Sequence, residues 1–403
     1  MTSLRKLASV FAIAIVAFPF SEADLPCIGV NRNKTMGEFI KDNLDFSDFL
    51  RAHKEKGKFF KKIVLDENHF PCKKLARSLS KPTSIDKLRP GDIDIIAAVG
   101  DSLTAASGAR ASNILGISNA YKGLTFSIGG YFAQERGAEA KSSIYNNVST
   151  HFTIANALKF YNPNLKGFSA GISSGEDWNS GFNMAVPGAK AIHLRAQVRK
   201  LVRELKKSTD FDNDWKLVTF FIGGNNLCQT CVDPNSSASN FEKDVKYSLD
   251  YLHQHLPRAF VNLITIFDIS FLKSMSKGHP ICDLAHTCFC SCALESPRKV
   301  RRISKNYVEV LTNLVETGRY DTRDDFKVVI QPFLEDIEPP QVDGKPDLTY
   351  FAPDCFHFSQ RGHNSAGRYL WNNMFELKKS RPNTFDPNMP IKCPTEEMPY
   401  LVA

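Results

Sequence analysis

Long apolar runs are scarce in this chain of 403 residues. Beyond residue 23 no stretch approaches the roughly 20 apolar residues that a membrane-spanning helix needs. The longest runs, such as Ala259–Phe267, are strand-sized and contain a polar residue. The segment Met398–Ala403 also lacks the hydrophobic tail of a lipid-anchor signal. With no internal repeat and no low-complexity tract, the sequence predicts an ordinary globular protein rather than a membrane-embedded or repeat protein.

Two further patterns are missing. No pair of histidines stands at zinc-finger spacing near the Cys-x-x-Cys pair, and no motif interleaves aromatic and basic residues as nucleic-acid-binding segments do. The formal net charge is +8, but the positive residues are spread along the chain. A basic surface favours anionic lipids or acidic partners, so a transient contact with a lipid surface stays open. A solvated basic surface is the main expectation. We expect no nucleic acid, metal, cofactor or obligate protein partner.

The first 23 residues have the three-part layout of a secretory signal peptide. Basic residues Arg5 and Lys6 precede the apolar run Leu7–Phe20, and Ser21-Glu22-Ala23 supplies a small-residue cleavage site. The alternative is an uncleaved N-terminal anchor. We therefore expect the mature chain to be secreted and extracellular. The N-x-S/T acceptors Asn33, Asn147 and Asn235 fit that route as glycosylation candidates.

All ten cysteines follow residue 23, and an even count in a secreted chain favours disulfides. Their connectivity cannot be deduced from spacing. A zinc knot is the alternative for Cys228-x-x-Cys231 and for the cluster at Cys282, Cys288, Cys290 and Cys292.

Strand and helix signals alternate after Pro90-Gly91. Continuous apolar runs indicate strands that are buried on both faces, as in a parallel sheet. The stretches between them have one apolar side, which is typical of amphipathic helices. This alternation predicts an α/β protein with a mainly parallel sheet in a three-layer α/β/α sandwich. The strands are expected at Ile93–Val99, Lys216–Ile222, Ala259–Phe267 and Phe326–Ile330, and the helices at Ala189–Lys207, Phe241–Leu256, Arg298–Gly318 and Arg361–Leu377.

The chain divides into four parts on these signals. We expect a signal peptide over residues 1–23 and a helical N-terminal extension over 24–90. The α/β domain would cover 91–379. A loose tail rich in Pro and Asn would cover 380–403.

Four short segments carry the candidate chemistry, and two of them come first in the chain. Ser102, in Gly100-Asp101-Ser102-Leu103, falls at a predicted strand-to-helix turn, where free N–H groups favour developing negative charge. A serine at such a turn is a suitable nucleophile, although an ordinary N-cap serine is the alternative. Gly188 could present its N–H to an oxyanion, or could be a plain turn glycine.

The other two segments lie further along the chain. In Gly223-Gly224-Asn225-Asn226 the Asn225 amide could donate to an oxyanion, with a Gly-Asn turn as the alternative. In Asp354-Cys355-Phe356-His357 the carboxylate can meet the imidazole and hold it in one tautomer, as a general base requires. His363 is a weaker candidate for the base. Cys355 lies between Asp354 and His357. A disulfide at Cys355 would fix this acid–base loop, and Cys288, Cys290 and Cys292 are candidate partners.

Taken in order, the four segments resemble the SGNH, or GDSL-type, hydrolases. Longer stretches, including residues 97–104, 214–219, 256–262 and 354–363, look like the animal phospholipase B/lipase group. The resemblance covers roughly residues 85–400. It implies a flavodoxin-like fold, a triad of Ser102, Asp354 and His357, and an oxyanion hole from the Ser102 N–H, the Gly188 N–H and Asn225. The family's usual Gly-Gly-Asn-Asp reads Gly-Gly-Asn-Asn here, so Asn226 replaces a carboxylate that shapes the loop.

The resemblance implies hydrolysis of phospholipids and lysophospholipids through an acyl-enzyme. Two alternatives remain: a secreted carboxylesterase or lipase acting on other acyl esters, and a secreted lipid-binding protein without turnover. A groove for the acyl chain could be lined by Tyr121, Phe126, Tyr131 and Phe132, or these residues could be ordinary packing. The G-x-S-x-G matches at Ser169 and Ser173 also resemble a nucleophile elbow, but they lie in a Gly/Ser-rich loop without the strand and helix that an elbow needs.

Overall fold

The fold is known from a computed structural model, which describes residues 70–131, 148, 151–173, 178–382, 384, 386 and 389–403. The expected signal peptide, most of the N-terminal extension, and the acceptors Asn33 and Asn147 lie outside the described residues. Asn235 is described and exposed, as a glycosylation acceptor has to be.

Four parallel strands form the central sheet, in the order β1-β4-β5-β6. Their bounds are β1 Ile93–Gly100, β4 Trp215–Phe221, β5 Ala259–Ile264 and β6 Phe326–Gln331. All residues of β1, β4 and β5 are buried, because helices cover both faces of the sheet. The apolar runs in the sequence therefore predicted these strands correctly.

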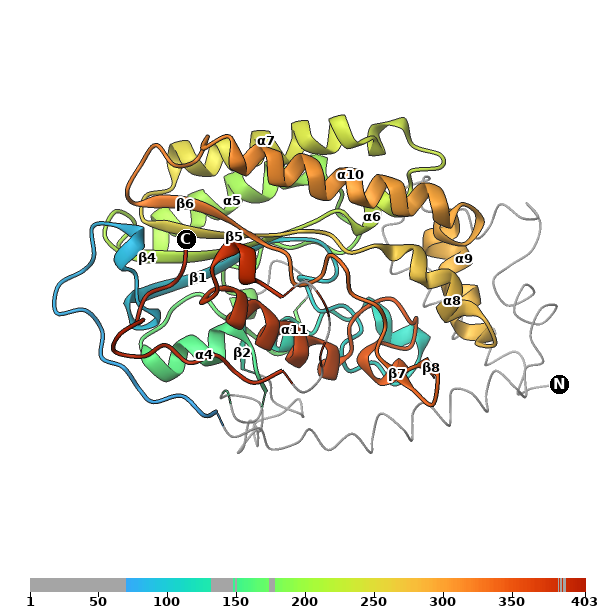
Figure 1. The fold of residues 1–403 in the computed structure, drawn as a ribbon, viewed down its shortest axis with the longest axis horizontal. Coiled ribbons are helices and arrows are strands. Elements are labelled where there is room, and N and C mark those ends of the chain that lie inside the picture. Colours follow the sequence, from blue (N-terminus) through green and yellow to red (C-terminus); the bar gives the residue numbers. More distant parts are fainter. Residues whose placement is uncertain are drawn as a thin grey trace.

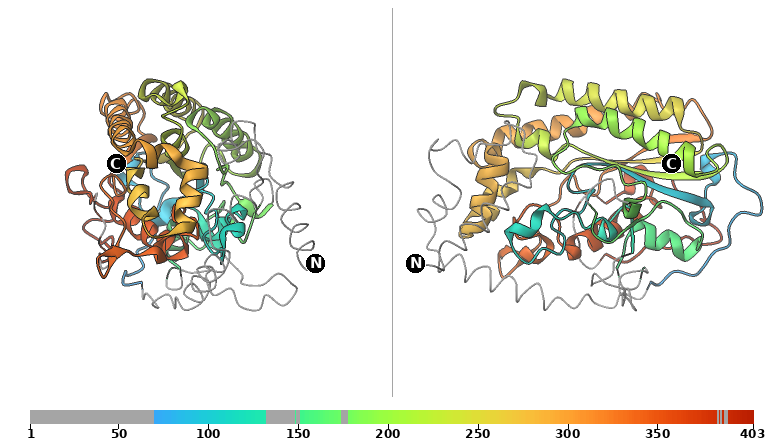
Figure 2. Two further views of the ribbon diagram at one scale, coloured as in Figure 1. Left: turned by 90° about the vertical axis from the view of Figure 1, so that its right-hand side faces the viewer. Right: turned by 180° about the vertical axis from the view of Figure 1, so that it is seen from behind.

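Helices α5 (Leu194–Ser208), α7 (Ala238–His255) and α10 (Pro297–Glu316) lie on one face of the sheet. Helices α4 (Ile154–Tyr161) and α11 (Gln360–Asn373) lie on the other (Figure 1; Figure 2, right). Each amphipathic helix turns its apolar side to the sheet. In α5, for example, Leu194, Val198 and Leu201 are fully buried. The predicted α/β/α sandwich is confirmed.

Short elements complete the described part of the chain. Three helices lie near the carboxyl ends of the strands: α6 (Gly224–Cys228), α8 (Leu272–Ser276) and α9 (Pro280–Glu295). Two small sheets pair β2 (Gly129–Tyr131) with β3 (Ser169–Ala170), and β7 (Gln341–Val342) with β8 (Lys345–Pro346). No helix of the described residues is long and apolar enough to cross a bilayer.

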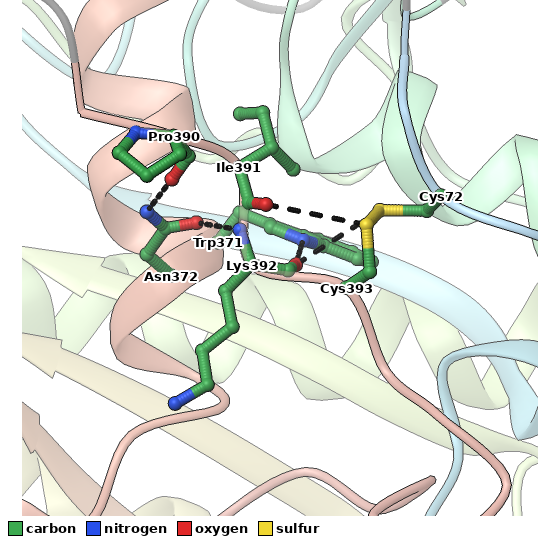
Figure 3. Close-up of a disulfide and its surroundings, with 7 residues drawn as sticks. All are labelled: Cys72, Trp371, Asn372, Pro390, Ile391, Lys392 and Cys393. Atoms are coloured by element: carbon green, nitrogen blue, oxygen red, sulfur yellow. Dashed lines mark hydrogen bonds between the residues drawn. A yellow bond between two sulfur atoms is a disulfide. The ribbon is translucent and has the colours of Figure 1, made fainter.

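The tail is not loose, so that expectation was wrong. Cys393 forms a disulfide with Cys72, 321 residues away in the sequence. The Trp371 indole donates to the Lys392 carbonyl at 2.8 Å, and Asn372 makes two 2.8 Å hydrogen bonds with the backbone of Pro390 and Lys392 (Figure 3). Polar side chains on α11 thus satisfy the backbone of an irregular segment, which composition alone does not reveal.

The described part of the N-terminal extension is not helical either. Residues 70–92 contain only two 3-10 turns, Ile85–Lys87 and Pro90–Asp92. Phe70 and Cys72 are nevertheless buried, and Cys72 carries the disulfide to the tail. This segment is fixed to the domain by side chains rather than by regular structure.

Candidate active site

Ser102 follows the last residue of β1, where Gly100 is tightly enclosed. A Cβ atom on Gly100 would lie 2.3 Å from the Phe221 carbonyl oxygen, so no other residue fits there. The Gln197 amide, buried on α5, clamps the same glycine with two 2.8 Å hydrogen bonds, one to its N–H and one to its carbonyl. The start of the candidate nucleophile turn is therefore held rigidly.

The turn itself differs from the predicted helix start. Ala105 N–H donates to the Asp101 carbonyl and Ser107 N–H to the Ser102 carbonyl, both at 2.9 Å. The chain then leaves the helical path because Ala106 has a φ of 55°. Residues 101–107 thus form one turn and no regular helix. Among the described residues, neither the N–H nor the hydroxyl of Ser102 has a hydrogen-bond partner.

Residues 182–188 run along the outer edge of β1. Met184 N–H donates to the Ala98 carbonyl at 2.8 Å, and Val186 N–H to the Gly100 carbonyl at 3.2 Å. This pairing places Gly188 close beyond the end of β1. Gly188 is exposed with a φ of 78°, and its N–H donates to no described residue. A left-handed glycine with a free N–H suits an anion.

The two asparagines after Gly223-Gly224 hold the Gly188 segment in place. Asn225 Nδ2 donates to the Ala189 carbonyl at 3.0 Å, so this amide lies beside Gly188. Asn226 Oδ1 accepts from Ala191 N–H at 2.9 Å. A carboxylate oxygen would accept the same hydrogen bond. The asparagine at position 226 can therefore hold this segment through the same kind of hydrogen bond that a carboxylate would accept.

Asp354 and His357 meet directly in a buried turn. His357 Nδ1 lies 2.5 Å from Asp354 Oδ2. The other carboxylate oxygen, Asp354 Oδ1, accepts from the N–H groups of Phe356 and His357 at 3.1 Å. The turn needs the left-handed conformation of Cys355, with a φ of 59°. His357 Nε2 accepts no hydrogen bond from the described residues, so the imidazole is oriented on one side and free on the other.

Burial and two carboxylates set the charge of this imidazole. Burial lowers the pKa of His357, but the charge and hydrogen bond of Asp354 and the charge of Asp101 outweigh it, so the pKa of His357 is raised. Burial raises the pKa of Asp354, and the charge and hydrogen bonds of the His357 turn more than reverse this, so its pKa is lowered. Asp354 is therefore ionised at neutral pH, as a group that orients a base must be.

Asp101 is a site residue to which the sequence analysis assigned no role. Burial raises the pKa of Asp101 to about 6, although Leu103 N–H and the His357 charge oppose that shift. Its Oδ1 accepts from Leu103 N–H at 3.0 Å. Gln197 was also missed, because a glutamine on an amphipathic helix carries no distinguishing signal.

The motifs converge at Gly224. A Cβ atom on this glycine would lie 3.6 Å from the Phe356 ring and 3.9 Å from Asp101 Oδ2. Gly224 thus stands between the Ser102 motif and the His357 motif, while its neighbour Asn225 contacts the Gly188 segment. No hydrogen bond between Ser102 Oγ and His357 Nε2 is found in the described part of the chain.

The weaker candidates have other partners. His363 is fully buried, stacks on Phe126, and has a pKa well below its ordinary value, first because of burial. Ser169 lies in β3 and donates to the Ser180 carbonyl at 2.7 Å, and the Ser173 hydroxyl bonds the Ser180 hydroxyl. A strand rather than a helix thus contains Ser169, so a nucleophile elbow is not formed there.

Of the two readings of Tyr121, Phe126, Tyr131 and Phe132, the structure favours ordinary packing for Phe126 and Tyr121. Phe126 is a core residue that packs on Phe221 and Phe333, and Tyr121 is buried against Ala106 and Leu124. The side chains of Tyr131 and Phe132 lie outside the described residues.

The cysteine-rich segments form disulfides. Cys228 pairs with Cys290 and Cys231 with Cys292. Cys355 pairs with Cys282, 73 residues away. A distant partner for Cys355 was expected, but the suggested trio was wrong. Cys290 bonds Cys228 at the end of α6, Cys292 bonds Cys231 just after it, and Cys288 is disulfide-bonded elsewhere.

Comparisons with known proteins agree with these motifs. The model of the GDSL-like lipase/acylhydrolase family matches residues 96–370. The chain is 40% identical to "Phospholipase B1, membrane-associated" from Homo sapiens over 336 residues, which is 79% of this chain and 22% of that protein. The protein of the same name from Rattus norvegicus is 39% identical over 367 residues, or 87% of this chain and 24% of that protein.

This chain therefore spans about a quarter of the length of those relatives. A crystal structure of a GDSL-like lipase from Parabacteroides merdae is 14% identical, with a TM-score of 0.36 over 72% of this chain and 98% of that one. The family model covers more than half of the chain and includes all the motifs described above. The protein belongs to the GDSL-like lipase/acylhydrolase family and is a hydrolase similar to animal phospholipase B.

Proposed function

We propose that the chain hydrolyses acyl ester bonds of phospholipids and lysophospholipids, with Ser102 as nucleophile, His357 as base and Asp354 as the group that orients it. The observation that carries this proposal is the convergence at Gly224 of the Ser102 and Asp354–His357 motifs, with Asn225 and Gly188 alongside. The names of the relatives support phospholipids as the substrate class.

The first half-reaction uses groups that have no partner in the described protein. His357 Nε2 removes the Ser102 hydroxyl proton while Oγ attacks the ester carbonyl. The Ser102 N–H, the Gly188 N–H and the second Nδ2 hydrogen of Asn225 donate to the oxyanion. His357 then gives its proton to the departing alcohol, which leaves an acyl group on Ser102.

Water completes the cycle by the same route in reverse. His357 takes a proton from water, hydroxide adds to the acyl carbonyl, and the fatty acid leaves as Ser102 is protonated. The negative Asp354 stabilises the imidazolium in both halves. Secretion, glycosylation at Asn235 and transient contact with a lipid surface belong to the same proposal.

Labelling with a fluorophosphonate probe tests this assignment. We expect one labelled peptide, carrying Ser102, and no label in Ser102→Ala. A folded wild-type protein that neither reacts with the probe nor hydrolyses any ester would instead be a lipid-binding protein. A substrate panel of phosphatidylcholine, lysophosphatidylcholine, triacylglycerol and short-chain esters then tests the substrate. Hydrolysis of the last two alone would favour a general carboxylesterase or lipase.

A further inference from the structure

Helix α9 contains several cysteines whose disulfides connect it to different segments of the candidate active site. Cys282 near its start bonds Cys355, which lies between Asp354 and His357. Cys290 and Cys292 near its end bond Cys228 and Cys231. Cys228 is the last residue of α6, the short helix that contains Asn225. One helix is therefore covalently linked to the acid–base turn and to the candidate oxyanion segment.

The N-terminal end of α9 is bonded to a turn whose backbone conformation is unfavourable by itself. Cys355 is in the left-handed conformation, which is unfavourable for a non-glycine residue unless its surroundings impose it. Cys282 and His286 are four residues apart and lie on one side of α9. Both are buried, and His286 faces the backbone of Cys355 and Asp354 while its Nδ1 bonds the Ser276 hydroxyl at 2.8 Å.

The C-terminal end of α9 is bonded to two cysteines, Cys228 and Cys231, that are three residues apart. Residues 290 and 292 would point to different sides of a regular helix. Cys290 instead breaks the helical path, with φ −151° and ψ 45°. This kink lets both sulfurs meet the α6 segment. Figure 2 (left) shows α8 and α9 in front of the sheet, at the carboxyl ends of the strands, where the candidate site lies.

We propose that α9 is a disulfide-bonded brace that fixes the Asp354–His357 turn relative to the Asn225 oxyanion donor, with Cys282, His286 and Cys355 as positioning residues. The proposal rests on the function proposed above. Without the brace, the left-handed turn at Cys355 relaxes, and the Asp354 carboxylate loses its contact with His357 Nδ1. A displacement of about 1 Å in such a constellation can cost about 10²-fold in rate.

The two ends of the brace have different expected signatures. In Cys282→Ser/Cys355→Ser, kcat should fall by about 10²-fold. The acid limb of the kcat/KM profile should also move to lower pH, because Asp354 no longer raises the pKa of His357. In the variant with Cys228, Cys231, Cys290 and Cys292 all changed to Ser, which removes both disulfides at this end, kcat should fall while the acid limb stays in place, because only the oxyanion side is released. KM for a soluble short-chain ester should change little in either variant.

The control is Cys72→Ser/Cys393→Ser, which removes the disulfide between the N-terminal segment and the tail. It should lower Tm and leave kcat and the acid limb unchanged. The brace is refuted if Cys282→Ser/Cys355→Ser, folded by circular dichroism, keeps the wild-type kcat and limb. It is also refuted if the control, at a similar loss of Tm, loses as much kcat and shows the same shift of the acid limb as the brace variant.

A gentler variant covers failure of the double mutants to fold. His286→Leu keeps every disulfide, removes the hydrogen bond to Ser276, and replaces the imidazole that faces the acid–base turn with an apolar side chain. We expect a smaller fall in kcat and a limb displaced in the same direction, and an unchanged limb would overturn the assignment of His286. A wild-type protein without Ser102-dependent hydrolysis would sink the proposed function itself, whereas an active wild type with an unaffected brace variant would sink only the brace.

Discussion

At the amino edge of the central sheet, acidic side chains are paired with cations, whereas polar groups at the carboxyl edge have been left without protein partners. Asp94 at the start of β1 accepts from Arg77 at 2.7 Å and from Trp215 N–H at 3.2 Å, and Lys81 bridges Asp94 and Asp214. At the other edge the Ser102 hydroxyl, the Gly188 N–H and His357 Nε2 have no partner among the described residues.

A groove does not by itself distinguish these edges. A wide groove of about 960 Å³ opens at the amino edge, with Asp250, His253, Arg319 and Arg323 on its walls. Its arginines are already paired, since Arg319 makes two hydrogen bonds to Asp250, and Arg323 two to Asp325. Unsatisfied donors and an oriented base therefore locate the chemistry better than an empty volume does. One edge stabilises the fold, and the other keeps its hydrogen-bonding groups for a substrate.

The largest expected effect comes from removing the proposed nucleophile at the carboxyl edge. Ser102→Ala should lower hydrolysis by at least about 10⁴-fold, because the remaining groups can bind the ester but cannot form the acyl-enzyme. Turnover of a soluble ester and probe labelling measure this. Ser169→Ala and Ser173→Ala are the matched controls and should retain activity. A labelled peptide containing either of them would contradict the assignment.

The next effect concerns the oxyanion donor. Asn225→Ala should keep the fold, since the side chain is only partly buried, and lower kcat by about 10²–10³-fold, or roughly 2.7–4 kcal/mol. The comparison is with the wild-type kcat at saturating substrate, after Tm has shown that the variant is folded. Normal turnover in the folded variant would remove Asn225 from the oxyanion hole.

The amino edge should respond in the opposite way. Asp94→Ala leaves the Trp215 N–H buried without an acceptor and unpairs Arg77, so the free energy of unfolding should fall by about 1–3 kcal/mol. Catalysis should be unaffected below Tm, because the substitution lies at the far end of β1 from Ser102. Denaturant unfolding and kcat are measured on the same preparation. A loss of kcat without a loss of stability would break the division between the two edges.

The sequence predicted the fold well where one strong signal decided the structure. Continuous apolar runs located β1, β4, β5 and β6, because strands buried on both faces tolerate few polar residues. The Asp354–His357 contact followed from spacing alone, since three residues in a turn bring the side chains together.

Contacts between distant segments were out of reach. Nothing in the spacing distinguishes Cys282 from Cys288 as the partner of Cys355. Gln197 contributes to the site only because the fold places it opposite Gly100, to which it is hydrogen-bonded. The tail was expected to be loose because it is rich in Pro and Asn, and composition does not show that Trp371 and Asn372 bind its backbone. The helix expected after Ser102 was wrong because Ala106 takes a left-handed conformation.

The pH dependence of activity sharpens the role of the carboxyl edge. His357 acts as a base only when it is unprotonated, so kcat/KM should rise with pH through a limb that lies above the ordinary value of about 6.5. Asp101→Asn keeps an oxygen for Leu103 N–H but removes the negative charge, so the limb should move to lower pH. A limb that stays in place would show that Asp101 does not act on His357.

The smallest effect is expected from restoring the family's usual residue at position 226. Asn226 Oδ1 already accepts from Ala191 N–H at 2.9 Å, and in Asn226→Asp a carboxylate oxygen takes the same place. The charge-assisted hydrogen bond is the stronger of the two, but the amide form is already made, so we expect kcat to stay within about threefold and stability to change by no more than about 1 kcal/mol. Asn226→Ala is the contrasting variant, because it leaves the Ala191 N–H buried without an acceptor and releases the segment that carries Gly188. Its kcat should fall while Asn226→Asp stays near wild type. Equal losses in the two variants would mean that the amide at 226 has a role that a carboxylate oxygen cannot perform, and that the loop is adapted to asparagine in this chain.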